Sequence, residues 1–155
     1  MGESGLVLEE KNALEAAADF QGEANGRVNP ECVVCGRENP CGMHLEFSAE
    51  SGVAKAHWTA AAGWESFKGT IHGGVTCAVL DEAMSRAIVS AGYSALTAEI
   101  RVRFREKVIP GEELEVRGWM GGVRKRKIEA QGSLLGADGV EKAHAWATFL
   151  TARGD

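Results

Sequence analysis

The chain has 155 residues, of which 17 are basic and 22 are acidic, and its net charge at neutral pH is −5. This length suits a single domain with its own apolar core, and the acidic balance disfavours a protein that coats nucleic acid. The N-terminus lacks the basic-then-apolar pattern of a secretion signal, and no apolar run approaches the roughly 18 residues of a membrane helix. We therefore expect a cytoplasmic protein with no nucleic-acid or membrane partner.

Residues 1–26 are predicted to form an N-terminal appendage, and residues 27–155 the folded domain. The stretch from Leu8 to Phe20 is rich in alanine, glutamate and leucine, which favours a short helix, and the polar residues after it are typical of a linker. From Asn29 to Gly42, prolines and glycines recur too often for regular structure. We expect an ordered loop there.

The hydrophobic pattern of the domain predicts an α+β architecture. Short alternating runs at 44–47 and 52–58 indicate two strands, and two apolar stripes between Val75 and Val89 indicate a largely buried helix. Four further strands are expected near 99–105, 114–120, 127–135 and 140–150, arranged as a meander with turns at Gly121-Gly122 and at 137–139. An antiparallel sheet wrapped around the single helix would bury both apolar surfaces.

The segment His72-Gly73-Gly74 leads from a loop directly into the predicted helix. Two glycines leave the first backbone N–H groups of the helix open to a ligand, and these groups, with the helix dipole, favour a developing negative charge. The oxyanion formed during thioester cleavage is such a charge. A plain structural turn is the alternative, because a Gly-Gly pair alone is a weak signal.

Asp81 lies in the middle of the predicted helix among apolar neighbours and has no cation one helical turn away. A carboxyl group in an apolar cleft can have a raised pKa and act as a base or nucleophile. The alternative is a hydrogen-bonded core acid. Glu82, by contrast, has Arg86 four residues later and is predicted to form a solvated ion pair with it.

His72 and Asp81 are nine residues apart, which corresponds to about 13 Å along one helix. The two side chains therefore cannot meet within one chain. If both serve one active site, Asp81 must act beside the His-Gly turn of a second subunit. This predicts at least a two-fold homodimer with two composite sites, and a tetramer made of two such dimers remains open.

The run HGGVTCAVLDEA, which starts at His72, resembles the signature of phenylacetate-pathway-type (PaaI-type) hotdog acyl-CoA thioesterases. The resemblance extends to Cys32-x-x-Cys35-Gly36, to Thr97-Ala98-Glu99 and to Pro110-Gly111-Glu112, and covers roughly residues 30–150. It implies a hotdog fold and hydrolysis of an acyl-CoA to free acid and coenzyme A. Coenzyme A is then part of the substrate, and no separate cofactor is implied.

Carried onto this sequence, the resemblance gives each motif residue a role. Asp81 would be the general base or nucleophile, and the Gly73 amide would donate to the oxyanion. His72 would position the turn, and Thr97 would orient either the attacking water or the carboxylate. The resemblance does not specify the acyl group.

Substrate contacts are predicted at Gly74, Ser66, Arg124 and Arg126. Ser66 stands where some relatives have an asparagine that holds the thioester carbonyl, and the shorter serine reaches less far. Arg124 and Arg126 belong to a run of four cations that is predicted to lie on a strand and could hold the phosphates of coenzyme A. A solvated strand edge is an equally good explanation of this run.

Cys32, Cys35, Cys41 and His44 have the C-x2-C-x5-C-x2-H spacing of a small zinc knuckle. Relatives with a similar Cys-x-x-Cys-Gly segment need no metal there, so we expect none, although the zinc interpretation remains open. Two other functions also remain open. A non-catalytic acyl-CoA-binding or regulatory module would tolerate loss of the Asp81 carboxylate, and an acyl-thioester hydratase would give a different product.

Overall fold

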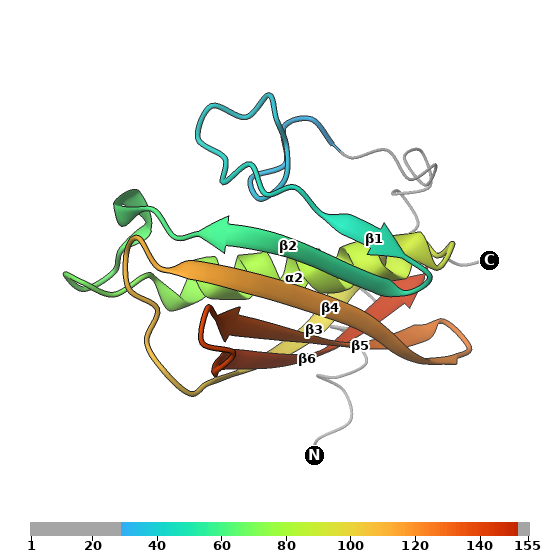
Figure 1. Cartoon of the computed structure of the whole chain (residues 1–155). Helices are drawn as coiled ribbons and strands as arrows, with labels where there is room; N and C mark the ends of the chain where they lie inside the picture. Colours follow the sequence, from blue (N-terminus) through green and yellow to red (C-terminus); the bar gives the residue numbers. More distant parts are fainter. Residues whose placement is uncertain (1–28, 152–155) are drawn as a thin grey trace, which may run out of the picture.

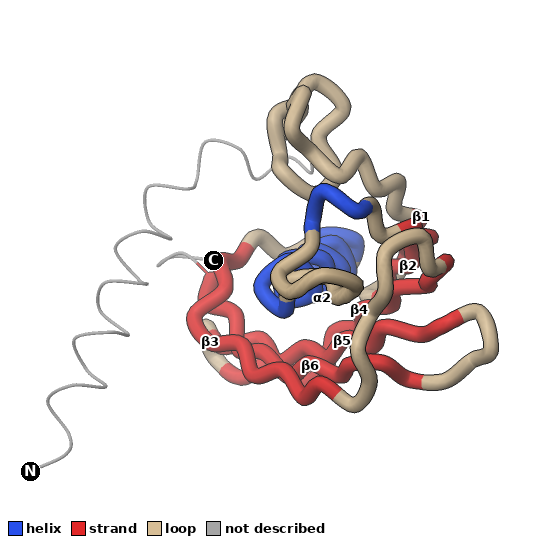
Figure 2. The backbone as a smooth tube through the Cα atoms, turned by 90° about the vertical axis from the view of Figure 1, so that its left-hand side faces the viewer, coloured by secondary structure: helices blue, strands red, loops and turns tan. Residues whose placement is uncertain are grey.

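The computed structural model describes residues 29–151, so the predicted appendage of residues 1–26 lies outside the described part of the chain. The elements are β1 (Ser48–Glu50), β2 (Val53–Thr59), the short 3-10 helix η2 (Ala62–Trp64), α2 (Gly73–Ser90), β3 (Ala95–Phe104), β4 (Glu113–Arg124), β5 (Lys127–Gly136) and β6 (Glu141–Thr151). The strands form one antiparallel sheet that curls around α2 (Figures 1 and 2). This arrangement confirms the predicted α+β hotdog fold.

α2 is the centre of the core because its apolar residues form adjacent stripes that face the sheet. The side chains of Val79, Leu80, Ala83, Met84, Ala87 and Ile88 are buried. They pack against the inward-facing residues of the strands, such as Val116 on β4 and Phe149 on β6. None of the helices in residues 29–151 is long and apolar enough to cross a membrane.

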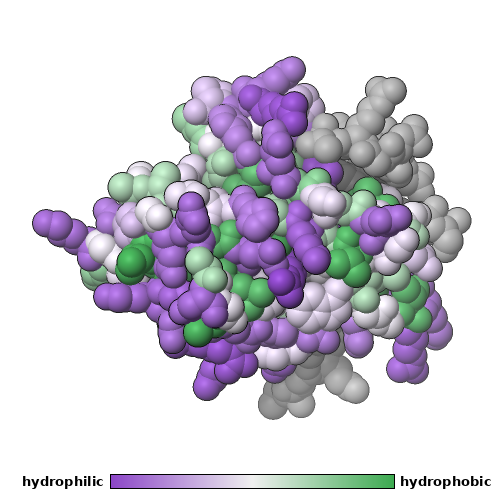
Figure 3. Space-filling view, in the orientation of Figure 1, coloured by the Kyte–Doolittle hydropathy of each residue, from purple (hydrophilic) through white to green (hydrophobic). Residues whose placement is uncertain are grey.

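Strand β2 shows the alternation that gives the sheet its two faces. Ala54, Ala56 and Trp58 are buried against the core, whereas Lys55 and His57 between them are exposed. The outer surface of this part of the sheet accordingly carries mainly hydrophilic side chains (Figure 3).

The strand order is β1-β2-β4-β5-β6-β3, so the predicted four-strand meander is wrong in one respect. β4, β5 and β6 are joined by hairpins, but β3 pairs with β6 at the far edge, and the chain then crosses back to pair β4 with β2. A sheet that closes around a helix needs strands on both sides of that helix. β1 and β2 lie at one end of the strand order, and β3, which follows α2 in the chain, lies at the other. β3 thereby becomes an edge strand.

The first strand also differs from the prediction. It spans Ser48–Glu50, and the predicted residues 44–47 precede it. His44 has a φ of 53°, which is the left-handed conformation and incompatible with an extended strand. The alternation in this short run therefore belongs to the loop of residues 29–47.

The hairpin between β4 and β5 turns later than predicted. Gly121 and Gly122 lie within β4, where the pairing register shifts between Met120 and Val123, and the turn itself is at Lys125, which has a φ of 55°. Such a shift is typical of a β-bulge, and glycine is common at bulges as well as at turns. Arg124 consequently ends β4 and Arg126 lies in the turn, so the prediction that both lie on a strand is wrong for Arg126.

Gly118 is where the sheet comes closest to α2. A Cβ atom at this position would lie 2.3 Å from the Ala83 carbonyl carbon and 2.6 Å from the Met84 amide nitrogen. These are backbone atoms, so no rotamer change relieves the clash, and we expect Gly118→Ala to lower the free energy of unfolding by about 3 kcal/mol. Urea unfolding measures the difference. Gly63→Ala is the control, since a Cβ there has no neighbour within 4 Å. Equal stability of the two variants would contradict the close contact.

Candidate active site

The turn that starts α2 leaves one backbone donor free. The His72 carbonyl accepts the N–H of Val75 at 3.0 Å and of Thr76 at 3.2 Å, and His72 Nδ1 accepts the Gly74 N–H at 2.9 Å. His72 is therefore the N-cap of the helix, with its Nδ1 unprotonated. The Gly73 N–H has no hydrogen-bond partner within residues 29–151. Of the two predicted amides, only that of Gly73 is available to a ligand.

The chain on either side fixes this turn in place. The His72 N–H donates to the Trp64 carbonyl at 2.8 Å, and the Ile71 N–H donates to the Val108 carbonyl at 2.8 Å. Ile71 itself is buried in the core. The free N–H is thus held on a rigid support, as a donor that must be positioned in advance requires.

A pocket of about 350 Å³ opens beside Gly73. Its wall includes Ser66 and Thr76, so Ser66, which was predicted to contact the substrate, lines the same pocket as Gly73. The ring of Phe104 also lines the pocket, and a Cβ on Gly73 would lie 3.3 Å from its Cζ. Glycine at this position therefore leaves room both for a ligand and for the aromatic ring.

Two cations that were not singled out in the sequence also line this pocket, Arg105 and Lys107. Arg105 forms an ion pair with Glu141 at 2.8 Å. Lys107 is exposed and has no ion pair among the described residues. In the sequence, Lys107 is marked only by its place just beyond the alternating residues of β3. That position does not distinguish a residue of a binding site from an ordinary surface lysine.

Asp81 lies eight residues after Gly73 on the same helix, or about 12 Å along its axis. The Thr97 hydroxyl donates to Asp81 Oδ1 at 2.7 Å. Burial raises the pKa of the Asp81 carboxyl group; the Thr97 hydrogen bond opposes this shift, and the negative charge of Glu82 adds to it. The structure brings Asp81 and Thr97 together and keeps both away from the His72 turn of the same chain.

The pair formed by Asp81 and Thr97 lies at an open edge of the sheet. β3 pairs with β6 on one side and with no other strand among the described residues, and its register shifts between Thr97 and Glu99. The 10-residue edge contrasts with the opposite edge, where β1 has only 3 residues. A strand of this length with one open edge is a template for pairing with another chain.

Arg124 and Arg126 lie far from the Gly73 pocket of their own chain. The Met120 N–H donates to the Gly52 carbonyl at 2.8 Å and the Gly52 N–H to Ser90 Oγ at 3.0 Å, which places the β4–β5 hairpin at the C-terminal end of α2. Arg126 is also engaged, with Nη2 2.6 Å from the Thr151 carbonyl. Of the two arginines, only Arg124 is exposed.

The ion pair of Glu82 and Arg86 forms at 2.8 Å, but the prediction that it is solvated is wrong, because both side chains are only 17% exposed. The loop of residues 29–47 covers them. Cys35 Sγ lies 2.9 Å from Glu82 Oε1, and burial, followed by the interactions with Glu82, raises the pKa of the Cys35 thiol to about 12. Long-range packing of a loop on a helix leaves no periodic signal in a sequence.

The predicted zinc ligands do not all converge. Cys41 is exposed, and His44 Nε2 donates to the Asn39 carbonyl at 2.6 Å. The structure instead brings Cys32 and Cys35 together with Glu82.

The family model described as the thioesterase superfamily matches residues 68–143, a range that holds the helix-start turn, Asp81 and Thr97. Over this range, which is just under half of the chain, the sequence matches the thioesterase superfamily. The predicted class of enzyme, a thioester hydrolase, is thereby confirmed. Among curated proteins, none matches this sequence.

Several solved structures share the fold of this chain at low sequence identity. Protein RHA08564 has a TM-score of 0.74 and 22% identity, covering 96% of this chain and 80% of its own. The Escherichia coli PaaI protein has a TM-score of 0.68 and 16% identity, covering 93% and 98%. A hypothetical thioesterase from Streptococcus pneumoniae, solved with coenzyme A, has a TM-score of 0.66 and 14% identity, covering 68% and 84%. These likenesses confirm the hotdog fold.

Proposed function

We propose that this protein hydrolyses an acyl-CoA to a free acid and coenzyme A at a composite site between two copies of the chain. One observation carries the proposal: the free Gly73 N–H and the Asp81 carboxyl group are about 12 Å apart on one helix, each in a setting suited to half of the reaction. The pneumococcal neighbour was solved with coenzyme A, and one from Streptococcus mutans was solved with acetyl-CoA. Both support this class of substrate.

The reaction begins with the thioester carbonyl oxygen at the Gly73 N–H. Asp81 of the second copy either takes a proton from a water that attacks the carbonyl carbon or attacks that carbon itself to form an anhydride, which water then opens. In both routes the oxyanion is stabilised by the amide and the helix dipole. The carbon–sulfur bond breaks, and the coenzyme A thiolate leaves and takes up a proton.

The other site residues act on these groups. The Thr97 hydroxyl holds Asp81 Oδ1 at 2.7 Å and leaves Oδ2 for the water or the carbonyl carbon. His72 Nδ1 accepts the Gly74 N–H, so the turn presents only the Gly73 N–H as a donor to the substrate. Ser66, which lines the same pocket, stands where it could contact the thioester carbonyl.

The two copies would pair edge to edge through β3, because Thr97 lies on this strand and Asp81 beside it. A two-fold axis at this edge extends the sheet and turns the open edge strand into an internal one. Each Asp81 can then approach the helix start of the other chain. A further pairing of dimers into a tetramer is compatible with this arrangement.

The phosphates of coenzyme A need cationic partners. Lys107 is the better placed of the candidates, since it lines the Gly73 pocket and is exposed. Arg124, at the opposite end of α2, could reach only the pocket of a second copy. Arg126 is the weakest candidate because its guanidinium already donates to Thr151.

A panel of aromatic, short-chain and medium-chain acyl-CoAs, assayed for release of free thiol, tests the proposed function. We expect turnover of at least one member, with acid and coenzyme A formed in equal amounts. Hydration of an unsaturated acyl-CoA without thiol release would identify a hydratase. Tight binding of acyl-CoA without any turnover would identify a binding module, and either result would overturn the proposal.

A further inference from the structure

A second cluster of reactive side chains lies where the loop of residues 29–47 packs on α2, away from the Gly73 pocket. The Sγ atoms of Cys32 and Cys35 and a carboxylate oxygen of Glu82 all lie within 4.8 Å of one another. Cys32 Sγ is 3.8 Å from Glu82 Oε2, and Cys35 Sγ is 2.9 Å from Glu82 Oε1. In a tetrahedral zinc centre, neighbouring sulfur and oxygen ligands are about 3.5 Å apart. The sulfur and oxygen atoms would have to shift by well under the length of a zinc–sulfur bond to reach that geometry.

The backbone of the loop holds the two sulfurs on the same side. The Gly36 N–H donates to the Cys32 carbonyl at 2.9 Å, which closes a tight turn over the C-x2-C segment. A Cβ on Gly36 would lie 2.3 Å from the Cys32 amide nitrogen, so only glycine permits this turn. The Leu45 N–H then ties the loop to itself by donating to the Val34 carbonyl at 2.9 Å. The spacing and the turn are those that present two thiolates to one metal ion.

Arg86 supplies the charge that such a centre needs in its half-buried position. Its Nη2 lies 2.8 Å from Cys35 Sγ, and its Nε lies 2.8 Å from Glu82 Oε1. Two thiolates and a carboxylate would balance one divalent cation and the guanidinium, which leaves no net charge to bury. The guanidinium N–H groups would also hydrogen-bond to ligand atoms, as groups around metal ligands commonly do.

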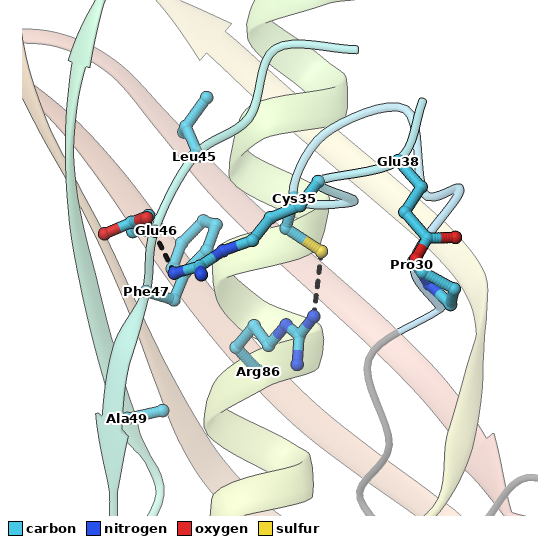
Figure 4. A pocket seen from close by; sticks show the side chains of 9 residues that line it. Pro30, Cys35, Glu38, Leu45, Glu46, Phe47, Ala49 and Arg86 are labelled. Atoms are coloured by element: carbon cyan, nitrogen blue, oxygen red, sulfur yellow. Dashed lines mark hydrogen bonds and ion pairs between the residues drawn. The ribbon is translucent and has the colours of Figure 1, made fainter. Parts of the chain in front are cut away.

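The cluster opens on one side to a pocket of about 640 Å³ that both Cys35 and Arg86 line (Figure 4). Pro30, Leu45 and Phe47 form other parts of its wall. Three protein ligands leave one position of a tetrahedral zinc ion open, and water from this pocket can reach it.

We propose that Cys32, Cys35 and Glu82 bind one Zn²⁺ ion, with water as the fourth ligand, and that the ion fastens the loop of residues 29–47 to α2. Thiolate ligands favour zinc over the hard cations Mg²⁺ and Ca²⁺. Binding replaces the protons of both thiols, which pass to solvent, and no atom changes its oxidation state. This site is separate from the proposed catalytic site and does not depend on the acyl-CoA chemistry.

The test uses the full-length protein, reduced, stripped with a chelator and then dialysed against Zn²⁺. We expect one zinc ion per chain and a Tm that rises by at least ~5 °C with saturating metal. Co²⁺ in place of zinc is expected to give an intense thiolate-to-cobalt charge-transfer band. Cys32→Ser and Glu82→Gln should each weaken zinc binding by at least ~10-fold, whereas Cys41→Ser, which changes an exposed cysteine of the same loop, should bind as the wild type does.

Several results would overturn the zinc site. Zinc that fails to bind to reduced wild-type protein, or that leaves its Tm unchanged, would do so. Zinc binding by Glu82→Gln as tight as that of wild type would show that α2 provides no ligand. This variant remains informative even if a cysteine variant fails to fold. A metal-free chain that has lost two hydrogen atoms and carries a disulfide between Cys32 and Cys35 even under the reducing conditions would assign the pair to redox chemistry instead.

Discussion

Replacing Asp81 with asparagine is expected to lower kcat/KM for the best acyl-CoA by at least ~100-fold, the size typical of losing a general base. The amide keeps the shape of the carboxylate, and its oxygen can still accept the Thr97 hydroxyl, which lies 2.7 Å from Asp81 Oδ1. It cannot take a proton or attack a carbonyl carbon. Thiol release by wild type and variant, at matched protein concentration, measures the loss.

The raised pKa of Asp81 predicts a second difference between this variant and wild type, in how stability and activity depend on pH. Burial raises the pKa in the folded state above its unfolded value, so the folded protein binds more protons between the two values and loses stability as the pH rises through them. Above both values the buried charge costs stability, and Asp81→Asn removes that cost. We expect the variant to be at least as stable as wild type at pH 7, while wild-type activity rises with pH as Asp81 loses its proton. A variant that unfolds at pH 7 would indicate a structural role for the carboxylate, and full activity would exclude a catalytic one.

The main element of the fold was predictable because its signal is local. The apolar stripes between Val75 and Val89 define a buried helix, and the strand alternation defines faces of a sheet. The neighbour of each strand is not a local property. Nothing in the alternation around Ile100 shows that β3 pairs with β6, since that choice depends on how the sheet closes around α2.

The candidate site shows the same limit. The helix start and Asp81 were recognisable from spacing, but spacing alone leaves the N–H groups of both Gly73 and Gly74 open to a ligand, and only the family resemblance singled out Gly73. The His72 side chain occupies one of them, which is a matter of rotamer and ring orientation. The environment of Glu82 was wrongly predicted because Cys35, its contact, is 47 residues away in the chain.

Gly73→Pro should remove the oxyanion donor without disturbing the helix. Proline lacks the N–H, and the first position of a helix tolerates it because that N–H has no partner within the helix. His72, with a ψ of 130°, already has the extended conformation that a residue before proline requires. We expect kcat to fall by ~100-fold or more. Gly73→Ala is the control, since it adds a similar contact with Phe104 and keeps the N–H; an equal loss of activity in both variants would point to crowding of the pocket.

The two inactive variants together test the composite site. In a mixed dimer of Gly73→Pro and Asp81→Asn chains, one site combines the intact Gly73 of the second chain with the intact Asp81 of the first, and the other site carries both defects. Co-expression with two different tags and purification through both should therefore restore about half of the wild-type activity per dimer, as expected for one intact site of two. If each site were built within one chain, every site in the mixed dimer would keep one defect and the activity would stay near that of the single variants. The 12 Å or so between Gly73 and Asp81 along α2 is the reason to expect restoration.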